Sequence, residues 1–404
     1  MILIYVSSAT PNDILTEYLN KYAKRPIRFV QQWWDYSMSV ALSSACDGQF
    51  EAISIPPVST FPTSKCVHHQ KHVVTDSNGV RFSFPTIWNL PIIKQLDLIR
   101  SIRREIRAIC RQSKGERIVI LTHCIYLQSA IPAFWARKKF CARVYTIVPD
   151  LPEHSTSVAL NGHRILKWMF SLYISITRKL SRMFDGYVCF TEHQMKYLNQ
   201  DKPHIVMEGF IDTALIDRIA LTESHPNRIV YAGGLMYRYG IRELVDGFIK
   251  AAIPDAELYI YGQGEADEYV IGKEEHNVFY GGCVSREEAI RAEKSCFLLV
   301  NPRPTGDEYT KCSFPSKLME YMATGIPVLT SKLGCIPKDY DDKLLYFIDI
   351  SADSIASTLK SCFARRDQIR EKGKLAKAFI RSKKNVQHQA QSIIRFIQTQ
   401  ELGK

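Results

Sequence analysis

The chain has 404 residues, of which 46% are hydrophobic and 23% charged. This composition excludes a disordered or fibrous protein, and the length predicts two domains of roughly 200 residues each. Residues 1–6 are typical of a strand and not of a signal peptide, and no run approaches the roughly 20 apolar residues that span a bilayer. The 11 cysteines lack paired spacing, which predicts reduced thiols in a cytoplasmic protein.

The formal net charge of +12 fits a nucleic acid, an anionic membrane surface or a phosphorylated substrate as partner. We recognise no nucleic-acid-binding module in the sequence, so we expect no nucleic-acid partner. Basic residues on ordinary solvated helix faces explain part of the charge without any partner.

Short β-rich runs alternate with helical runs along the chain. In the first half we predict strands at 2–6, 50–55, 117–122, 143–148 and 186–190, and a helix at 92–112. The second half restarts the pattern, with strands at 228–231, 257–261 and 296–300 and a helix at 243–252. This alternation is typical of an α/β protein with two doubly wound, Rossmann-like domains. We place the domains at 1–210 and 211–384, followed by a terminal helix at 385–404 that can cross back to the first domain.

Two polar side chains follow predicted strands of the first half. His123 comes after the strand 118–122 and Asp150 after the strand 143–148, with Glu153 and His154 on the same loop as Asp150. Ligands of doubly wound sheets bind at the carboxyl ends of the strands. His123 and Asp150 are therefore our candidate catalytic residues, and the alternative is that each of them only caps a turn.

Residues 163–179 form an apolar stretch that contains aromatic residues and has basic residues at both ends. This pattern fits a helix that lies in the interface of an anionic membrane. The alternative, which the pattern favours slightly, is a helix buried in the domain with solvated ends.

Strands of the second half open through glycine. The glycines and the residues beside them that we expect near a ligand are Gly233 and Gly234 after the first strand, Gly262 after the second, and Cys283 and Val284 after a third run at 279–282. Glycine lets a backbone approach a ligand closely, and a helix that begins after such a turn offers unpaired N–H groups to phosphate. Arg238 adds a guanidinium to the first loop. Each turn alone is an ordinary strand-to-helix connection, but together they converge on one rim.

The run 313–329 carries the most specific chemistry. Pro315 suits the first turn of a helix, where Ser316 and Lys317 present N–H groups and an ammonium to an anion. Glu320 lies about one turn further on and can accept hydrogen bonds from two neighbouring hydroxyls, such as those of a ribose.

The order of these segments resembles the C-terminal domain of family 4 glycosyltransferases, and within that family the bacterial capsule and exopolysaccharide enzymes. The resemblance rests on the Gly-Gly loop, Gly-x-Gly, Gly-Gly-x-Val and, from Ser313 onward, Ser-Phe-Pro-Ser-Lys-x-x-Glu-Tyr-Met-Ala-x-Gly-x-Pro-Val. It extends to Asn301-Pro302-Arg303-Pro304-Thr305 and covers residues 228–345. The first half is similar only in layout and in residues 150–153.

This resemblance implies the GT-B fold, in which two Rossmann-like domains face a cleft. It implies sugar transfer from a nucleotide-diphosphate sugar to a glycan or lipid-linked acceptor, with retention and without a metal or other cofactor. It places the diphosphate near Gly234, Arg238, Ser316 and Lys317, the ribose on Glu320, and the base edge near Cys283 and Val284. Such an enzyme is expected in the cytoplasm, with peripheral contact to the inner face of the plasma membrane as an option.

Two positions depart from the family pattern. The family pairs two glutamates eight positions apart, and Cys312 stands at the first position, with Glu308 as a substitute carboxylate. The lysine that usually precedes the loop glycine is Tyr239, with Arg238 one place earlier. Two alternatives stay open: a sugar-nucleotide epimerase of the same fold, and a non-catalytic nucleotide-sugar-binding subunit. A dinucleotide oxidoreductase is excluded because no Gly-x-Gly-x-x-Gly follows the first strand.

Overall fold

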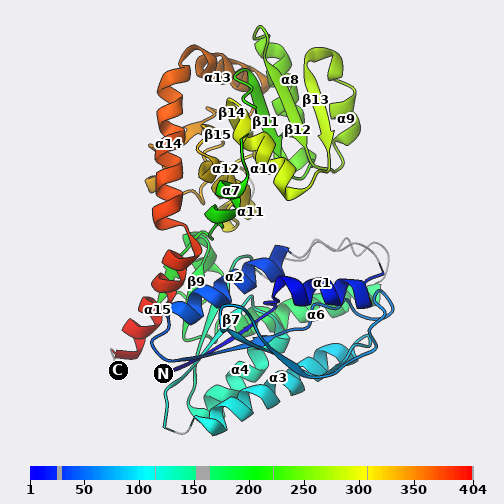
Figure 1. Cartoon of the computed structure of the whole chain (residues 1–404), viewed down its shortest axis with the longest axis vertical. Helices are drawn as coiled ribbons and strands as arrows, with labels where there is room; N and C mark the ends of the chain where they lie inside the picture. The colour runs from blue at the N-terminus through cyan, green and yellow to red at the C-terminus, as the bar shows by residue number, and fades with distance from the viewer. Residues whose placement is uncertain (25–29, 114, 152–163, 222, 307, 403–404) are drawn as a thin grey trace. The chain divides into compact units, whose positions relative to one another are not determined.

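The computed structural model describes residues 1–404 except 25–29, 114, 152–163, 222, 307 and 403–404. The chain divides into two compact units, which we call unit 1 (Met1–Glu208 with Val386–Lys404) and unit 2 (Gly209–Asn385). Each unit contains a largely or wholly parallel sheet with helices packed on it (Figure 1). The prediction of an α/β protein with two Rossmann-like sheets is confirmed.

Unit 1 is built on an eight-stranded sheet with the order β10-β9-β8-β7-β1-β2-β5-β4. Its strands are β1 (Ile2–Ser7), β2 (Gln49–Ser54), β4 (His72–Thr75), β5 (Arg81–Phe84), β7 (Ile118–His123), β8 (Arg143–Val148), β9 (Gly186–Cys189) and β10 (His204–Val206). All neighbours pair in parallel except β4 with β5. The central strands β1 and β7 are buried along their whole length, as helices on both faces of a parallel sheet require.

The helices of unit 1 fall into two groups. α1 (Asn12–Tyr22) and α2 (Val30–Ala45) connect β1 to β2, whereas α3 (Ile93–Gln112), α4 (Leu127–Phe140) and α6 (Arg164–Ser181) belong to crossovers in the opposite direction. Because parallel crossovers are right-handed, α2 lies on one face of the sheet and α3 and α4, which contact each other, lie on the other, as α2 and α4 do in Figure 1. The last helix, α15 (Val386–Leu402), packs against α2, and Glu401 Oε1 accepts a 2.9 Å hydrogen bond from the Tyr145 hydroxyl.

An antiparallel edge, β4 with β5, is absent from the sequence-based prediction. Its turn is held by Asp76, whose Oδ1 accepts hydrogen bonds from the N–H groups of Asn78 (3.0 Å) and Val80 (2.8 Å). Gly79 completes the turn with a φ of +78°, a conformation that glycine adopts without steric cost. The turn residues are a hairpin signal, but the flanking runs are short and partly polar, so alternation alone does not reveal the strands. A second antiparallel pair joins β3 (His68–His69) to β6 (Ile87–Trp88).

Unit 2 contains a six-stranded sheet with the order β13-β12-β11-β14-β15-β16. The strands, all parallel, are β11 (Arg228–Ala232), β12 (Glu257–Tyr261), β13 (Val278–Gly282), β14 (Leu298–Asn301), β15 (Val328–Thr330) and β16 (Leu345–Tyr346). The order places β11 and β14 side by side in the middle, although the chain reaches β14 only after β12 and β13. This is the switch point of a doubly wound sheet, where ligands bind.

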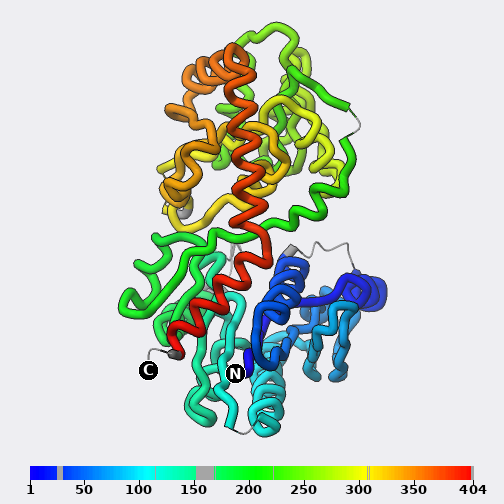
Figure 2. The backbone as a smooth tube through the Cα atoms, turned by 60° about the vertical axis from the view of Figure 1, so that its left-hand side comes forward, coloured from blue at the N-terminus to red at the C-terminus, as the bar shows by residue number. Residues whose placement is uncertain are grey.

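The helices of unit 2 complete two apolar clusters. One cluster joins α8 (Ile241–Ala251) and α13 (Ala352–Ala364) to the sheet. The other joins α7 (Thr213–Arg218), α12 (Ser316–Thr324) and α14 (Arg366–Lys383) to it. The remaining helices are α9 (Asp267–Ile271), α10 (Arg286–Ser295) and α11 (Glu308–Cys312). The chain then passes from α14 into α15, drawn in orange-red and red in Figure 2.

All 11 cysteines are free thiols. Within the described part of the chain, no helix is long and apolar enough to cross a membrane.

Candidate functional site

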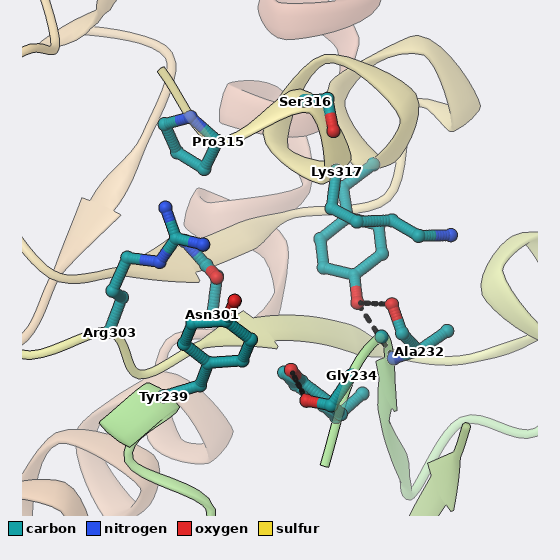
Figure 3. A pocket seen from close by; sticks show the side chains of 11 residues that line it. Ala232, Gly234, Tyr239, Asn301, Arg303, Pro315, Ser316 and Lys317 are labelled. Atoms are coloured by element: carbon teal, nitrogen blue, oxygen red, sulfur yellow. Dashed lines mark hydrogen bonds between the residues drawn. The ribbon is translucent and has the colours of Figure 1, made fainter. Parts of the chain in front are cut away.

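A pocket of about 80 Å³ lies at the carboxyl ends of β11 and β14 in unit 2. Its lining comes from the end of β11 and the loop after it, from the end of β14 and the segment after it, and from the first turns of α12 (Figure 3). The lining residues are Tyr231, Ala232, Gly233, Gly234, Tyr239, Asn301, Arg303, Pro315, Ser316, Lys317 and Tyr321. Of the predicted donor-binding residues, the structure thus brings together Gly233, Gly234, Ser316 and Lys317.

Glycine is required where the loops around the pocket cross. A Cβ on Gly262, which has a φ of +135°, would lie 1.8 Å from the carbonyl oxygen of Gly233. A Cβ on Gly240 would lie 2.1 Å from the carbonyl oxygen of Pro302. Gly262 is outside the pocket lining, so its function in the structure is to let the loop after β12 pack on the Gly233 loop.

The hydroxyl of Tyr321 ties α12 to the end of β11. It accepts a 2.7 Å hydrogen bond from the N–H of Ala232 and donates one of 3.1 Å to the carbonyl of the same residue (Figure 3). Tyr321 is fully buried, so both bonds are shielded from water. The first turn of α12 is therefore held at a defined distance from the glycine loop.

A cluster of four ionisable side chains joins α10 to α12 beside the pocket. Lys317 Nζ lies 2.6 Å from Glu320 Oε1 and 3.6 Å from Glu293 Oε1, and Arg286 Nη2 lies 3.4 Å from Glu320 Oε2. Glu293 is completely buried. Burial, and then the Glu320 carboxylate, raise the pKa of Glu293 to about 8.

Glu320 has the opposite behaviour. Burial by itself would raise its pKa, but the Lys317 ammonium and then the Arg286 guanidinium outweigh burial and hold the pKa below its usual value. Glu320 is therefore an ionised acceptor, suited to a ribose hydroxyl, whereas Glu293 is protonated at neutral pH. Sequence reasoning missed Arg286 and Glu293, because the local sequence of a helix does not show which charged residues of another helix they meet.

The remaining predicted donor-binding residues lie outside the pocket lining. Arg238 is exposed on the loop after β11. Cys283 is exposed and Val284 half-buried on the loop after β13, which leads directly into α10 and hence to Arg286. Among the positions that depart from the family pattern, Cys312 is buried. The substitute carboxylate Glu308 is exposed and pairs with Lys311 at 2.9 Å.

In unit 1 the ring of His123 is buried at the end of β7, under the indole of Trp34 at a centroid distance of 4.6 Å. His123 Nδ1 lies 2.6 Å from Oδ1 of Asp35. Asp35 is completely buried and also accepts hydrogen bonds from the hydroxyls of Tyr5 (3.0 Å) and Ser8 (2.6 Å). Burial by itself would lower the pKa of His123, but the Asp35 carboxylate and then Cys124 together outweigh burial and raise the pKa well above its usual value.

Asp35 is a further residue that sequence reasoning missed, since it stands 88 positions before its histidine partner. Asp150 is half-buried two residues beyond β8. Glu153 and His154 lie outside the described residues. Within the described part of the chain, no group of three or more His, Cys, Asp or Glu side chains is arranged to hold a metal ion.

The helix α6 presents an apolar face to solvent. Trp168, Leu172 and Ile176 are 66%, 46% and 41% exposed, and their spacing of four places them on one side of the helix. Arg178, Lys179 and Arg182 are exposed at its C-terminal end. This side of α6 is not buried in the domain, contrary to the reading that the sequence pattern favours slightly.

Residues 226–364 match the family model described as "Glycosyl transferases group 1". No curated protein sequence matches the chain. Among solved structures, a sucrose-phosphate synthase from Thermosynechococcus elongatus is similar at a TM-score of 0.63 and 15% identity, with 100% of both chains covered. A glycosyltransferase from Rickettsia africae is similar at a TM-score of 0.64 and 13% identity, covering 100% of this chain and 99% of that one.

A third similar structure is Anabaena Alr3699/HepE in complex with UDP, at a TM-score of 0.59 and 12% identity, covering 98% of this chain and 99% of that one. At identities this low, the structural similarity establishes the fold alone. Because it covers 98–100% of this chain, the shared fold includes both units. The family match covers the segment of unit 2 that contains the pocket. Residues 226–364 are therefore similar to the glycosyl transferases group 1 family, in a chain with the GT-B fold.

Proposed function

We propose that this chain is a glycosyltransferase that moves a sugar from a nucleotide-diphosphate sugar to a glycan or lipid-linked oligosaccharide. The observation that carries the proposal is the pocket of unit 2, where the glycine loop and the first turn of α12 meet at the switch point of the sheet. Unpaired N–H groups at a helix start favour an anionic ligand. One similar structure holds UDP and another, from E. coli, holds UDP-2-fluoro glucose, which supports a nucleotide-sugar donor here.

Within this function, the ionised Glu320 is proposed to accept hydrogen bonds from the ribose, and the loop with Cys283 and Val284 to contact the base. The diphosphate then lies over Gly234, Ser316 and Lys317, and the positive charge of Arg238 acts on it at longer range. On the acceptor side, Asp150 and His123 remain the proposed catalytic residues. We further propose transfer with retention and without a metal, in cytoplasmic synthesis of a polysaccharide such as a capsule or exopolysaccharide; the support is the family resemblance of residues 228–345.

Thermal unfolding in the presence of UDP, GDP and ADP and of their sugar conjugates tests the proposal first, because a ligand that binds only the folded state raises the apparent stability. Transfer of labelled sugar to lipid-linked and glycan acceptors tests it second. A nucleotide that binds without any sugar transfer favours the non-catalytic subunit. The buried Cys312, which stands in place of a glutamate, supports the same alternative. Conversion of the sugar nucleotide in the absence of an acceptor favours the epimerase.

We also propose that unit 1 binds an anionic membrane surface through the exposed face of α6, where a lipid-linked acceptor is anchored. An apolar side flanked by basic residues is the composition of helices that lie in a membrane interface. Lys and Arg near an anionic surface each contribute about 1 kcal/mol of attraction. The formal net charge of +12 acts in the same direction.

Co-sedimentation with vesicles tests the membrane proposal. Binding is expected to anionic and not to neutral vesicles, and to decline with added salt because screening limits the electrostatic reach to about 8 Å at physiological ionic strength. Leu172→Glu is expected to abolish it. Leu375→Glu is the matched control, since Leu375 is 49% exposed on α14 of unit 2. Equal binding to both kinds of vesicle, or equal effects of the two substitutions, rules the α6 surface out.

A further inference from the structure

Tyr239 stands where the family resemblance leads us to expect a lysine, and its ring contacts two guanidinium groups. Cζ of Arg303 lies 4.8 Å from the ring centroid and Cζ of Arg238 lies 5.2 Å from it. Arg238 Nη2 also donates a 3.4 Å hydrogen bond to the Tyr239 hydroxyl. Both distances are within the roughly 6 Å over which a cation is attracted to an aromatic ring. The position therefore carries no charge of its own but organises two positive charges.

The two arginines differ in where they lie. Arg303 lines the pocket, whereas Arg238 does not and is exposed. Figure 3 shows the guanidinium of Arg303 between the Tyr239 ring and Pro315, at the end of the pocket formed by the start of α12. Of the two groups on the tyrosine ring, Arg303 is the one placed to touch a ligand in the pocket.

The backbone holds Arg303 and Tyr239 together. Gly240, with a φ of +77°, packs so closely on Pro302 that a Cβ would lie 2.1 Å from the Pro302 carbonyl oxygen. Gly240 directly follows Tyr239 in the chain, and Pro302 directly precedes Arg303. The loop after β11 and the segment after β14 therefore meet at the stacked pair. The stack is thus built into the crossing of two loops and does not depend on a flexible surface side chain.

Lys317 is the other cation of the pocket lining, and its charge is already engaged. Its Nζ lies 2.6 Å from Glu320 Oε1, so the pair is close to neutral as seen from the pocket. A guanidinium, by contrast, offers a planar fork of N–H donors that matches two phosphate oxygens. Charge and geometry in the pocket therefore both favour Arg303 as the phosphate ligand.

We propose that Arg303, supported on the Tyr239 ring, is the principal contact of the donor diphosphate, in place of a lysine at position 239. The inference rests on the proposed function, since it specifies how the same pocket holds its nucleotide. Arg238, which sequence reasoning places on the diphosphate, then acts only through its charge at longer range. Arg303, 64 positions after Tyr239, takes over the role that the family gives to the lysine.

Titration calorimetry with UDP, GDP and ADP and with the corresponding nucleosides tests this assignment. Arg303→Ala is expected to weaken the best-bound diphosphate about tenfold to more than a hundredfold, as is typical for loss of a charged hydrogen-bond partner, and to leave the nucleoside unaffected. Arg238→Ala is expected to change both affinities less than about threefold, because an exposed charge is screened by solvent. The matched control is Arg242→Ala, since Arg242 is exposed and stacks on Tyr237 and Tyr269 outside the pocket lining.

A rescue experiment separates charge from fold. Tyr239→Lys in the Arg303→Ala background is expected to recover at least about tenfold in diphosphate affinity, because it returns a positive charge to the same place. Unchanged diphosphate affinity in Arg303→Ala, an equal loss of nucleoside affinity, or a double variant with no recovery each overturns the assignment while the proposed function stands. Absence of binding of all three diphosphates to the unmodified protein refutes the proposed function itself.

Discussion

The replacement of Glu293 by glutamine is expected to change how the stability of unit 2 depends on pH. Glu293 is completely buried, its nearest cation is Lys317 at 3.6 Å, and neither carboxyl oxygen has a hydrogen-bond partner among the described residues. Burial and the neighbouring Glu320 raise its pKa from 4.5 to about 8. Between these values the folded protein holds a proton that the unfolded chain has released.

The sign and size of the effect follow from proton linkage. Because the folded state binds the extra proton, the free energy of unfolding falls as pH rises from about 4.5 to about 8, by about 1.4 kcal/mol for each pH unit. Over the whole window the loss is at most on the order of 5 kcal/mol. Glutamine has nearly the shape of the protonated acid and does not titrate, so Glu293→Gln removes this slope.

Urea unfolding at several pH values measures the slope. All five tryptophans, at positions 33, 34, 88, 135 and 168, lie in unit 1, so tryptophan fluorescence reports unit 1 alone. Far-UV circular dichroism reports both units, and the part of its change that fluorescence does not follow is assigned to unit 2. Glu287→Gln, an exposed residue of the same helix, is the matched control and keeps the slope of the unmodified protein. Parallel pH profiles for Glu293→Gln and the unmodified protein would refute the assignment of a buried, protonated Glu293.

Four further results are expected. Glu320→Gln should weaken the binding of nucleoside and of nucleoside diphosphate alike, by about 1–3 kcal/mol, and the loss should be smaller for a deoxyribose analogue. Titration calorimetry with both ligands measures this, and unaltered affinities for both would show that Glu320 does not bind the ribose. Asp150→Ala should abolish most turnover and leave donor affinity nearly unchanged, and His123→Ala should reduce turnover less. Near-normal turnover in the Asp150 variant contradicts a catalytic role of Asp150. His123→Ala also leaves Asp35 buried without its partner, so its unfolding free energy should fall by about 3–5 kcal/mol, read by tryptophan fluorescence. Added chelator should change neither nucleotide affinity nor turnover, and a loss of either points to a metal.

The sequence by itself was sufficient for the parallel sheets and for several of the residues that line the pocket of unit 2. Buried parallel strands are nearly continuous apolar runs, so the strand at 143–148 is predicted with the bounds that β8 has in the structure. Gly233 and Gly234 could be found because a glycine pair after a strand is a local turn signal, and Ser316 because Pro315 marks the start of a helix. Such local restrictions are written into single positions and short spacings, which is why they can be read without a structure.

Only the tertiary structure decided which distant side chains meet. Asp35 reaches His123 from another secondary-structure element, Glu293 faces Lys317 across two helices, and Arg303 stacks on Tyr239 from the next strand of the sheet but a distant part of the chain. Nothing in the local sequence distinguishes these residues from solvated charges, because the cost of burying a charge and the partner that compensates it are properties of the packed core. The exposed face of α6 is decided in the same way: an apolar stripe is identical in sequence whether a neighbour covers it or water does, and packing alone tells the two apart.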